Sequence, residues 1–231
     1  MIVDLVYKLV QQIANKDEVS GYISPEEFNN AARFVQLEWI TENYNPVSKL
    51  GYENNNSASD VFSTFKQEVP IIVSNGFITK PDNYLHYSSA RVAAEFSDGM
   101  RYFPMELVRD YELAERLASE INKPSKRFAI LTNQDDGFDV YPQNIDLVNL
   151  SYIRTPLDPW WNYTVVSGEP VFAETGGTTT NPNDASNNST DFELDETEVP
   201  YLTHKILKYF GIEVENQMLY QAINNEAKTE D

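Results

Sequence analysis

The chain has 231 residues, enough for one or two domains, and a formal net charge of −19 from 36 acidic and 17 basic residues. This charge disfavours tight binding to nucleic acid phosphates. A hydrophobic content of 41% and an aromatic content of 13% indicate a folded protein. The lack of cysteine excludes disulfides and thiolate chemistry, and no apolar run reaches the ~20 residues that span a bilayer.

The N-terminal part, residues 1–69, is predicted to be helical because apolar residues recur at helical spacing over 3–14 and 24–43. The second helix has the clearer start: Ser24 is a candidate N-cap, Pro25 takes the first helical position and Glu27 completes a capping box. A short third helix is expected over 61–68. The predicted buried stripes consist of Val3, Val6, Val10 and Ile13, and of Phe28, Ala32, Val35 and Trp39.

The following region, residues 70–172, is predicted to be β-rich. Its turn signals and β-prone runs indicate two antiparallel hairpins, one short helix and one further strand. The predicted segments are strands 84–96 and 101–108, helix 111–120, strands 127–132 and 138–141, and strand 145–154.

Residues 173–198 carry seven acidic residues and no Lys or Arg. We interpret them as an acidic polar arm that orders on neighbouring subunits, because so polar a segment buries little apolar surface. Residues 199–231 are predicted to form two helices, 199–210 and 215–226, that pack on the N-terminal bundle. The predicted fold class is therefore α+β, with N- and C-terminal helices forming a bundle and a central antiparallel β region.

The strand over 145–154 ends at Thr155-Pro156, because proline cannot donate to a ladder. The chain then presents two adjacent tryptophans. They have two interpretations: core packing at a strand exit, or anchors of a protein interface. The interface candidates on this stretch are Trp160, Trp161, Tyr152 and Arg154.

No metal, cofactor or catalytic site is predicted. His86 and His204 are far apart and lie in no ligand-spaced cluster. The run Asp135-Asp136-Gly137 weakly resembles a calcium loop, but a hairpin turn explains it better because the ligand alternation and terminal Glu of an EF-hand are missing. The chain has no nucleophile elbow and no phosphate-binding glycine loop, so the prediction is a protein that is not an enzyme.

A series of short segments, in order along residues 20–220, resembles structural proteins of crAss-like and related Bacteroidetes bacteriophages. The insertion 173–189 is not part of this pattern, and the family has no catalytic residues to transfer. The matching segments are ISPEEFNNAA at 23–32 with QLE at 36–38, PDNYLH at 81–86, Pro124 with Arg127 and 129–130, VYP at 140–142, LSYIRTP at 150–156 with Pro159 and Trp161, 193–194, HKIL at 204–207 and 211–212.

The resemblance implies a ring protein of the phage neck, the head-to-tail connector between portal and tail. Such a portal adaptor is made in the host cytoplasm and forms a cyclic homo-oligomer in the virion, commonly a dodecamer. It contacts the portal and other neck or tail rings, and DNA passes through its channel without specific binding during ejection. No membrane is involved. The alternative is a host-facing or glycan-binding virion module that uses exposed Trp and Tyr as a sugar platform.

Overall fold

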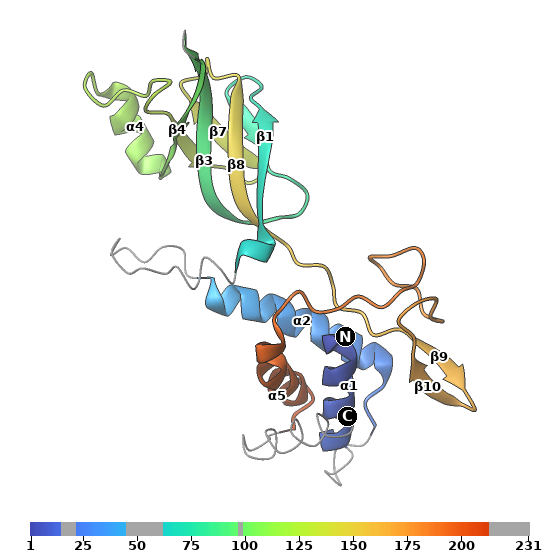
Figure 1. Cartoon of the computed structure of the whole chain (residues 1–231). Coiled ribbons are helices and arrows are strands. Elements are labelled where there is room, and N and C mark those ends of the chain that lie inside the picture. Colours follow the sequence, from blue (N-terminus) through green and yellow to red (C-terminus); the bar gives the residue numbers. More distant parts are fainter. Residues whose placement is uncertain (15–21, 45–61, 97–98, 213–231) are drawn as a thin grey trace. The chain divides into compact units, whose positions relative to one another are not determined.

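The computed structural model describes residues 1–14, 22–44, 62–96 and 99–212 (Figure 1). The described chain is a mixed α+β protein with three mostly antiparallel sheets. It divides into two compact units: one holds the described residues up to 44 and from 156 onward, and the other holds residues 62–155. The predicted region limits fall at other places, after residues 69 and 172. No described helix is long and apolar enough to cross a membrane.

The first unit contains helices α1 (Ile2–Ala14), α2 (Pro25–Asn43) and α5 (Val199–Tyr209). The predicted stripes of α1 and α2 are buried, and the predicted capping box at Ser24 and Glu27 is confirmed. Helix α1 receives its cap from far along the chain: Asp191 accepts hydrogen bonds from the backbone N–H groups of Ile2 (3.0 Å) and Val3 (2.7 Å). A carboxylate suits this position because a helix N-terminus has unpaired donors and a positive dipole end.

Helix α5 packs against both α1 and α2 and buries Val199, Leu202 and Ile206, as its spacing predicts. It ends at Gly211, which has the positive φ of 78° expected at a helix C-terminus. The expected last helix, 215–226, lies outside the described residues.

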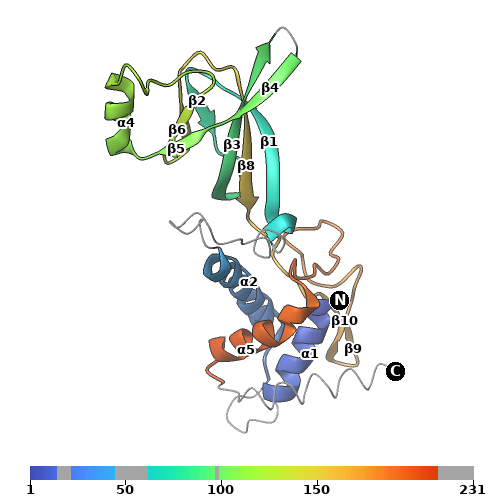
Figure 2. The ribbon, with the colours of Figure 1, turned by 60° about the vertical axis from the view of Figure 1, so that its left-hand side comes forward.

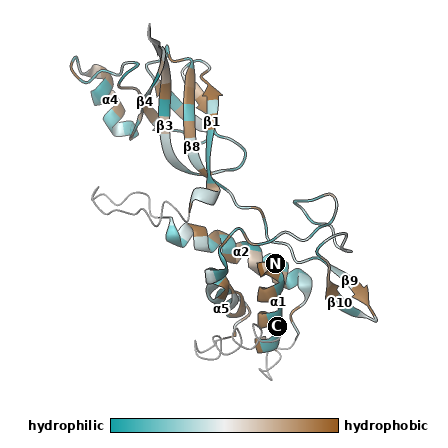
Figure 3. Ribbon diagram, in the orientation of Figure 1, coloured by the Kyte–Doolittle hydropathy of each residue, from teal (hydrophilic) through white to brown (hydrophobic). Residues whose placement is uncertain are grey.

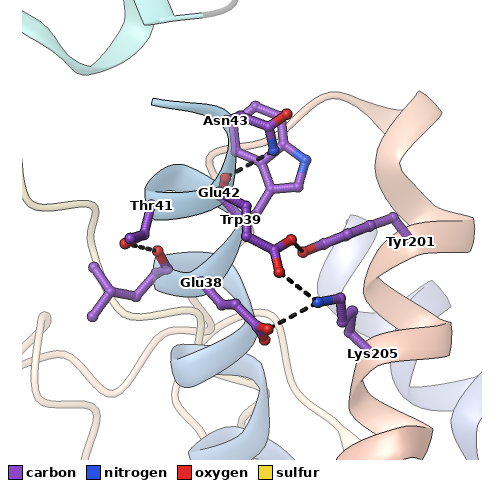
Figure 4. Close-up of polar contacts among 8 residues, drawn as sticks. Glu38, Trp39, Thr41, Glu42, Asn43, Tyr201 and Lys205 are labelled. Carbon is purple, nitrogen blue, oxygen red and sulfur yellow. Dashed lines mark hydrogen bonds and ion pairs between the residues drawn. The ribbon is translucent and has the colours of Figure 1, made fainter. Parts of the chain in front are cut away.

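Polar contacts also join α5 to α2 (Figure 4). Lys205 Nζ lies 2.8 Å from Glu38 Oε1 and 2.9 Å from Glu42 Oε1, and the Tyr201 hydroxyl donates to Glu42 at 2.7 Å. These hydrogen bonds lower the pKa of Glu42 and raise that of Lys205. Burial, followed by the bond to Glu42, raises the pKa of Tyr201 to about 12.

The second unit is built from two four-stranded sheets. The first has the order β1-β8-β3-β4 and is antiparallel; the second has the order β2-β7-β6-β5, with β5 and β6 parallel. Its strands are β1 (Lys66–Ile72), β2 (Phe77–Thr79), β3 (Tyr84–Phe96), β4 (Gly99–Pro104), β5 (Glu106–Val108), β6 (Ile130–Asn133), β7 (Gly137–Tyr141) and β8 (Leu147–Arg154).

The two sheets enclose one core. The chain passes from one sheet to the other at Met105. The Met105 N–H donates to Ala90 O in the first sheet, and the next N–H, of Glu106, donates to Ala129 O beside the second. The shared core contains residues from both sheets, among them Ala90, Val92, Leu131, Phe138, Val148 and Leu150.

Two predicted elements of this unit are wrong in part. Residues 61–68 were expected to be helical, but the helical portion is a single 3-10 turn, Phe62–Phe65, and Lys66 already starts strand β1. The predicted strand 101–108 is divided between β4 and β5, in different sheets. The hairpins β3–β4 and β6–β7 and strand β8 are confirmed. Helix α4 (Asp110–Ala118) forms near its predicted place.

The first unit also contains a hairpin that was not predicted, β9 (Tyr163–Val166) and β10 (Glu169–Phe172). The acidic segment follows it. Contacts within its own chain hold this segment, so it does not lack internal support; the expected contact with neighbouring subunits stays a prediction. Asn162 is fully buried; its amide donates to Thr179 O and Asn187 O, and its carbonyl oxygen accepts from Thr179. Ala173, Phe192 and Leu194 of the segment are buried as well.

Candidate functional site

Trp161, the first of the predicted interface candidates, is a core residue of the first unit and 2% exposed. Its ring stacks on Tyr7, with ring centroids 3.9 Å apart, and its indole N–H donates to Asp4 at 3.0 Å. Its backbone N–H and C=O pair with the side-chain amide of Asn29 at 2.8 and 3.1 Å. Trp161 therefore follows the core-packing interpretation, and its side chain is not available at the surface.

Tyr152 is also buried, within the second unit. Its ring belongs to the core between the sheets, and its hydroxyl lies 2.8 Å from Asn83 Oδ1 and 2.9 Å from Gln67 Oε1. Burial raises the pKa of this hydroxyl. The side chain therefore fixes the turn before β3 and does not face a partner.

Trp160 and Arg154 are half-buried. The Trp160 backbone pairs with Thr190 in both directions, at 2.8 and 2.9 Å, and its buried Nε1 has no hydrogen-bond partner among the described residues. The Arg154 guanidinium lies over the ring of Phe65, 5.8 Å from the centroid, and donates to Thr155 O at 3.2 Å. The four candidates are divided between the two units, with Trp160 and Trp161 in the first and Tyr152 and Arg154 in the second.

The first exposed apolar surface is the β9–β10 hairpin (Figure 3). Ser167 and Gly168 form its two-residue turn, and both have positive φ, as a type I′ turn requires. Val165, Val166 and Val171 are about half exposed, at 59%, 53% and 47%. A two-stranded sheet has little stability of its own, so a partner that covers these valines would stabilise the hairpin. Val166 and Val171 lie on one face of the hairpin and Val165 on the other, and we call the three residues together the hairpin surface.

The second exposed apolar surface belongs to the other unit and surrounds helix α4, which connects β5 to its parallel neighbour β6 (Figure 2). Such a crossover helix usually buries an apolar face on the sheet, yet no residue of α4 is buried. Leu117 is 40% exposed, and Ile121 and Phe128 beyond the helix are 94% and 76% exposed.

A cleft of about 270 Å³, which we call the α4 cleft, is lined in part by Ile121 and Phe128. Arg116 and Glu106 form an ion pair of 2.9 Å in its lining, and the buried Ala129 and Ile130 also contribute to it. Residues 121–128 add three cations, Lys123, Lys126 and Arg127, and no acid. The α4 cleft thus has a mixed polar and apolar lining, in which the exposed Ile121 and Phe128 lie with Lys123, on a chain that is strongly negative overall.

The described residues contain no group of three or more His, Asp or Glu side chains placed to hold a metal ion. His86 and His204 lie in different units, and burial lowers the pKa of His86. The run Asp135-Asp136-Gly137 forms the turn between β6 and β7, where Lys80 Nζ donates to the backbone oxygen of Asp135 at 3.0 Å. The hairpin-turn interpretation is therefore confirmed.

The exposed apolar residues that sequence reasoning missed are the hairpin valines, Ile121 and Phe128. A signal for the hairpin was present, because two β-prone runs flank Ser167-Gly168. No protein-family model matches the chain, and a search of curated proteins found no match.

Proposed function

We propose that this protein is a non-enzymatic structural subunit of a phage neck ring, a cyclic homo-oligomer between portal and tail through which DNA passes. The observation that carries the proposal is that the chain exposes two different apolar surfaces, the hairpin surface and the α4 cleft, one on each unit. A closed ring of identical subunits uses head-to-tail contacts, which need two unlike surfaces on every copy. The ordered resemblance to phage neck proteins supports the same assignment.

In this proposal the helices from both ends of the chain act as one bundle, with α5 tied to α1 and α2. The bundle and the β unit each have their own core, so each can present a surface to a different neighbour. The portal, other neck rings and a second copy of this chain are the proposed partners, with twelvefold symmetry as the copy number that matches a portal.

The alternative of a glycan-binding module loses its tryptophans and keeps exposed tyrosines, among them Tyr102 and Tyr111. None of the chain's three tryptophans is exposed: Trp39 and Trp161 are buried and Trp160 is half-buried. A sugar platform needs an aromatic face open to solvent.

Sedimentation velocity of the full chain tests the ring. We expect large closed assemblies that the substitution Val166→Glu disrupts, because it places a charge on the hairpin surface. Ser63→Glu adds the same charge at an exposed position elsewhere and should leave the assembly intact. A chain that stays monomeric at every concentration would contradict the cyclic oligomer.

Labelling of the protein in intact virions tests whether it lies in the neck. The proposal requires the label at the neck. A label confined to the capsid interior or to the receptor-binding tip would refute it.

A further inference from the structure

We propose that the α4 cleft binds the C-terminal segment, residues 213–231, of a second copy of this chain. The inference rests on the proposed function in one respect, that contacts between copies build a ring. It goes further by assigning one of those contacts to a defined cleft and a defined segment.

The cleft presents two exposed apolar side chains within a lining that is otherwise mixed in polarity. Ile121 and Phe128, which both line it, are two of the three most exposed large apolar side chains in the described residues. Covering such side chains is favourable because it removes apolar surface from water. Ala129 and Ile130 in the lining are already buried, and Ile130 begins β6, an inner strand of sheet β2-β7-β6-β5. The cleft therefore presents Ile121 and Phe128 beside a fixed support.

The loop 121–128, which contributes Lys123 to the cleft lining, favours an acidic partner. Lys123 and Lys126 form no ion pair with any described residue, and Arg127 is their neighbour in sequence. The acid in the lining, Glu106, is already paired with Arg116. Opposite charges across an interface steer association and fix its register.

The C-terminal segment has the matching composition. Residues 213–231 contain five acidic residues and one Lys. Val214, Met218 and Ala222 recur at intervals of four, with Leu219 and Ile223 beside them, which is the pattern of one apolar helix face. An amphipathic helix that lays its apolar face into a groove is a common mode of peptide recognition.

A second copy of the chain fits the cleft better than DNA does. A phosphate backbone would pair with Lys123 and Lys126 but offers no apolar surface to Ile121 and Phe128. The segment supplies both the acids and the apolar face. A cleft on one copy and a segment on the next are also two unlike surfaces, as a head-to-tail ring requires.

Disulfide trapping tests the inference directly, because the native chain has no cysteine. Asn122→Cys places a thiol in the cleft lining, and Ala222→Cys places one on the predicted apolar face of the segment. The two single variants, carrying tags of different length, are mixed and oxidised. We expect a disulfide-linked dimer of the two different chains. Adding Lys123→Glu should reduce its yield several-fold, whereas Lys66→Glu, at an exposed position on β1, should not.

The controls decide between the outcomes. If Asn122→Cys links equally well to a chain carrying Ser63→Cys, the contact is random collision and the inference is overturned. If the disulfide forms only within one dilute chain that carries both cysteines, the segment binds its own chain, and the proposed contact between copies is wrong. Closed rings in sedimentation without the expected disulfide would overturn this inference and leave the proposed function standing. The disulfide without a closed ring would support the inference and contradict the ring.

Discussion

Buried amide side chains organise the irregular part of the first unit. The segment after β8 has few ladder partners, so its backbone donors and acceptors must be paired in another way. Asn29 pairs with both backbone groups of Trp161, Asn162 pairs with Thr179 and Asn187, and Gln36 donates to Leu157 O while accepting from the Glu193 N–H. All three side chains are buried. Polar residues thereby order a segment that its apolar content alone would not.

Trp161 is the residue on which α1, α2 and the β9–β10 hairpin meet, so we expect Trp161→Ala to destabilise the first unit. The loss should be about 3–5 kcal/mol, the usual range for removing a large buried aromatic. Urea unfolding followed by far-UV circular dichroism measures it. Trp160→Ala is the matched control and should have the smaller effect because its side chain is half-buried. Equal losses in the two variants would contradict the central role of Trp161.

Gly177 tests the Asn162 network. A Cβ atom at Gly177 would lie 2.2 Å from Asn162 Cγ, far inside contact distance. Gly177→Ala should therefore displace Asn162 and destabilise the unit by about 1–3 kcal/mol, the usual range for overpacking. An added Cβ at Gly176 has open space around it, but φ is 64°. The loss of stability in Gly176→Ala therefore measures the cost of placing alanine in this left-handed backbone conformation, with no steric contact added. Unfolding curves in which Gly177→Ala is no worse than Gly176→Ala would show that the contact relaxes freely.

At the scale of elements, the helices α1, α2 and α5 could be predicted because their apolar spacing and end signals agree. The helix expected over 61–68 failed for a physical reason: Phe62 and Phe65 are three residues apart, which is helical spacing, but the chain from Lys66 on pairs with β8. Strand β1 depends on a partner more than 70 residues away, and local spacing carries no trace of that partner. The turn between β4 and β5 at Met105 is likewise set by the two sheets.

The candidate site was less predictable than the fold. Aromatic side chains at a strand exit suit a core and an interface equally, and only the positions of Tyr7 and Asn29 decide that Trp161 is buried. The exposed face of α4 is a tertiary property too, because its sequence shows the same apolar spacing as a helix that is covered. The turns at Ser167-Gly168 and at Asn75-Gly76 were missed signals that the local sequence contains.

The link between α2 and α5 should depend on pH. The pKa of Glu42 lies below its usual value of 4.5 in the folded chain because Lys205 and Tyr201 donate to it. A depressed pKa contributes stability that is fully present above the unfolded value and is lost as the pH falls through the folded value. We therefore expect unfolding midpoints to fall from pH 7 to pH 3, and to fall less in Glu42→Gln. If the native chain and Glu42→Gln had midpoints with the same pH dependence, the prediction that Glu42 makes the link between α2 and α5 depend on pH would be wrong.

At the scale of the whole molecule, the net charge of the chain favours the proposed passage of DNA over tight binding of DNA. The chain carries −19, and its local excess of cations is the loop 121–128 with Lys123, Lys126 and Arg127. A ring that lets DNA slide must avoid a dense array of phosphate contacts, because each contact releases counterions and adds affinity. A single short cationic loop satisfies this requirement.

The last prediction concerns duplex DNA. Since each neutralised phosphate adds about 0.9 to the slope of log affinity against log salt, the three cations of loop 121–128 allow a slope no steeper than about −3. We expect weak binding at low salt that disappears near physiological salt, measured by fluorescence anisotropy of a labelled duplex over a salt series. Lys123→Glu should reduce the slope and Lys66→Glu should not, because Lys66 lies on β1, outside the loop. Tight binding at physiological salt with a much steeper slope would show a phosphate-binding surface, and the proposal of a channel that DNA merely passes would then be wrong.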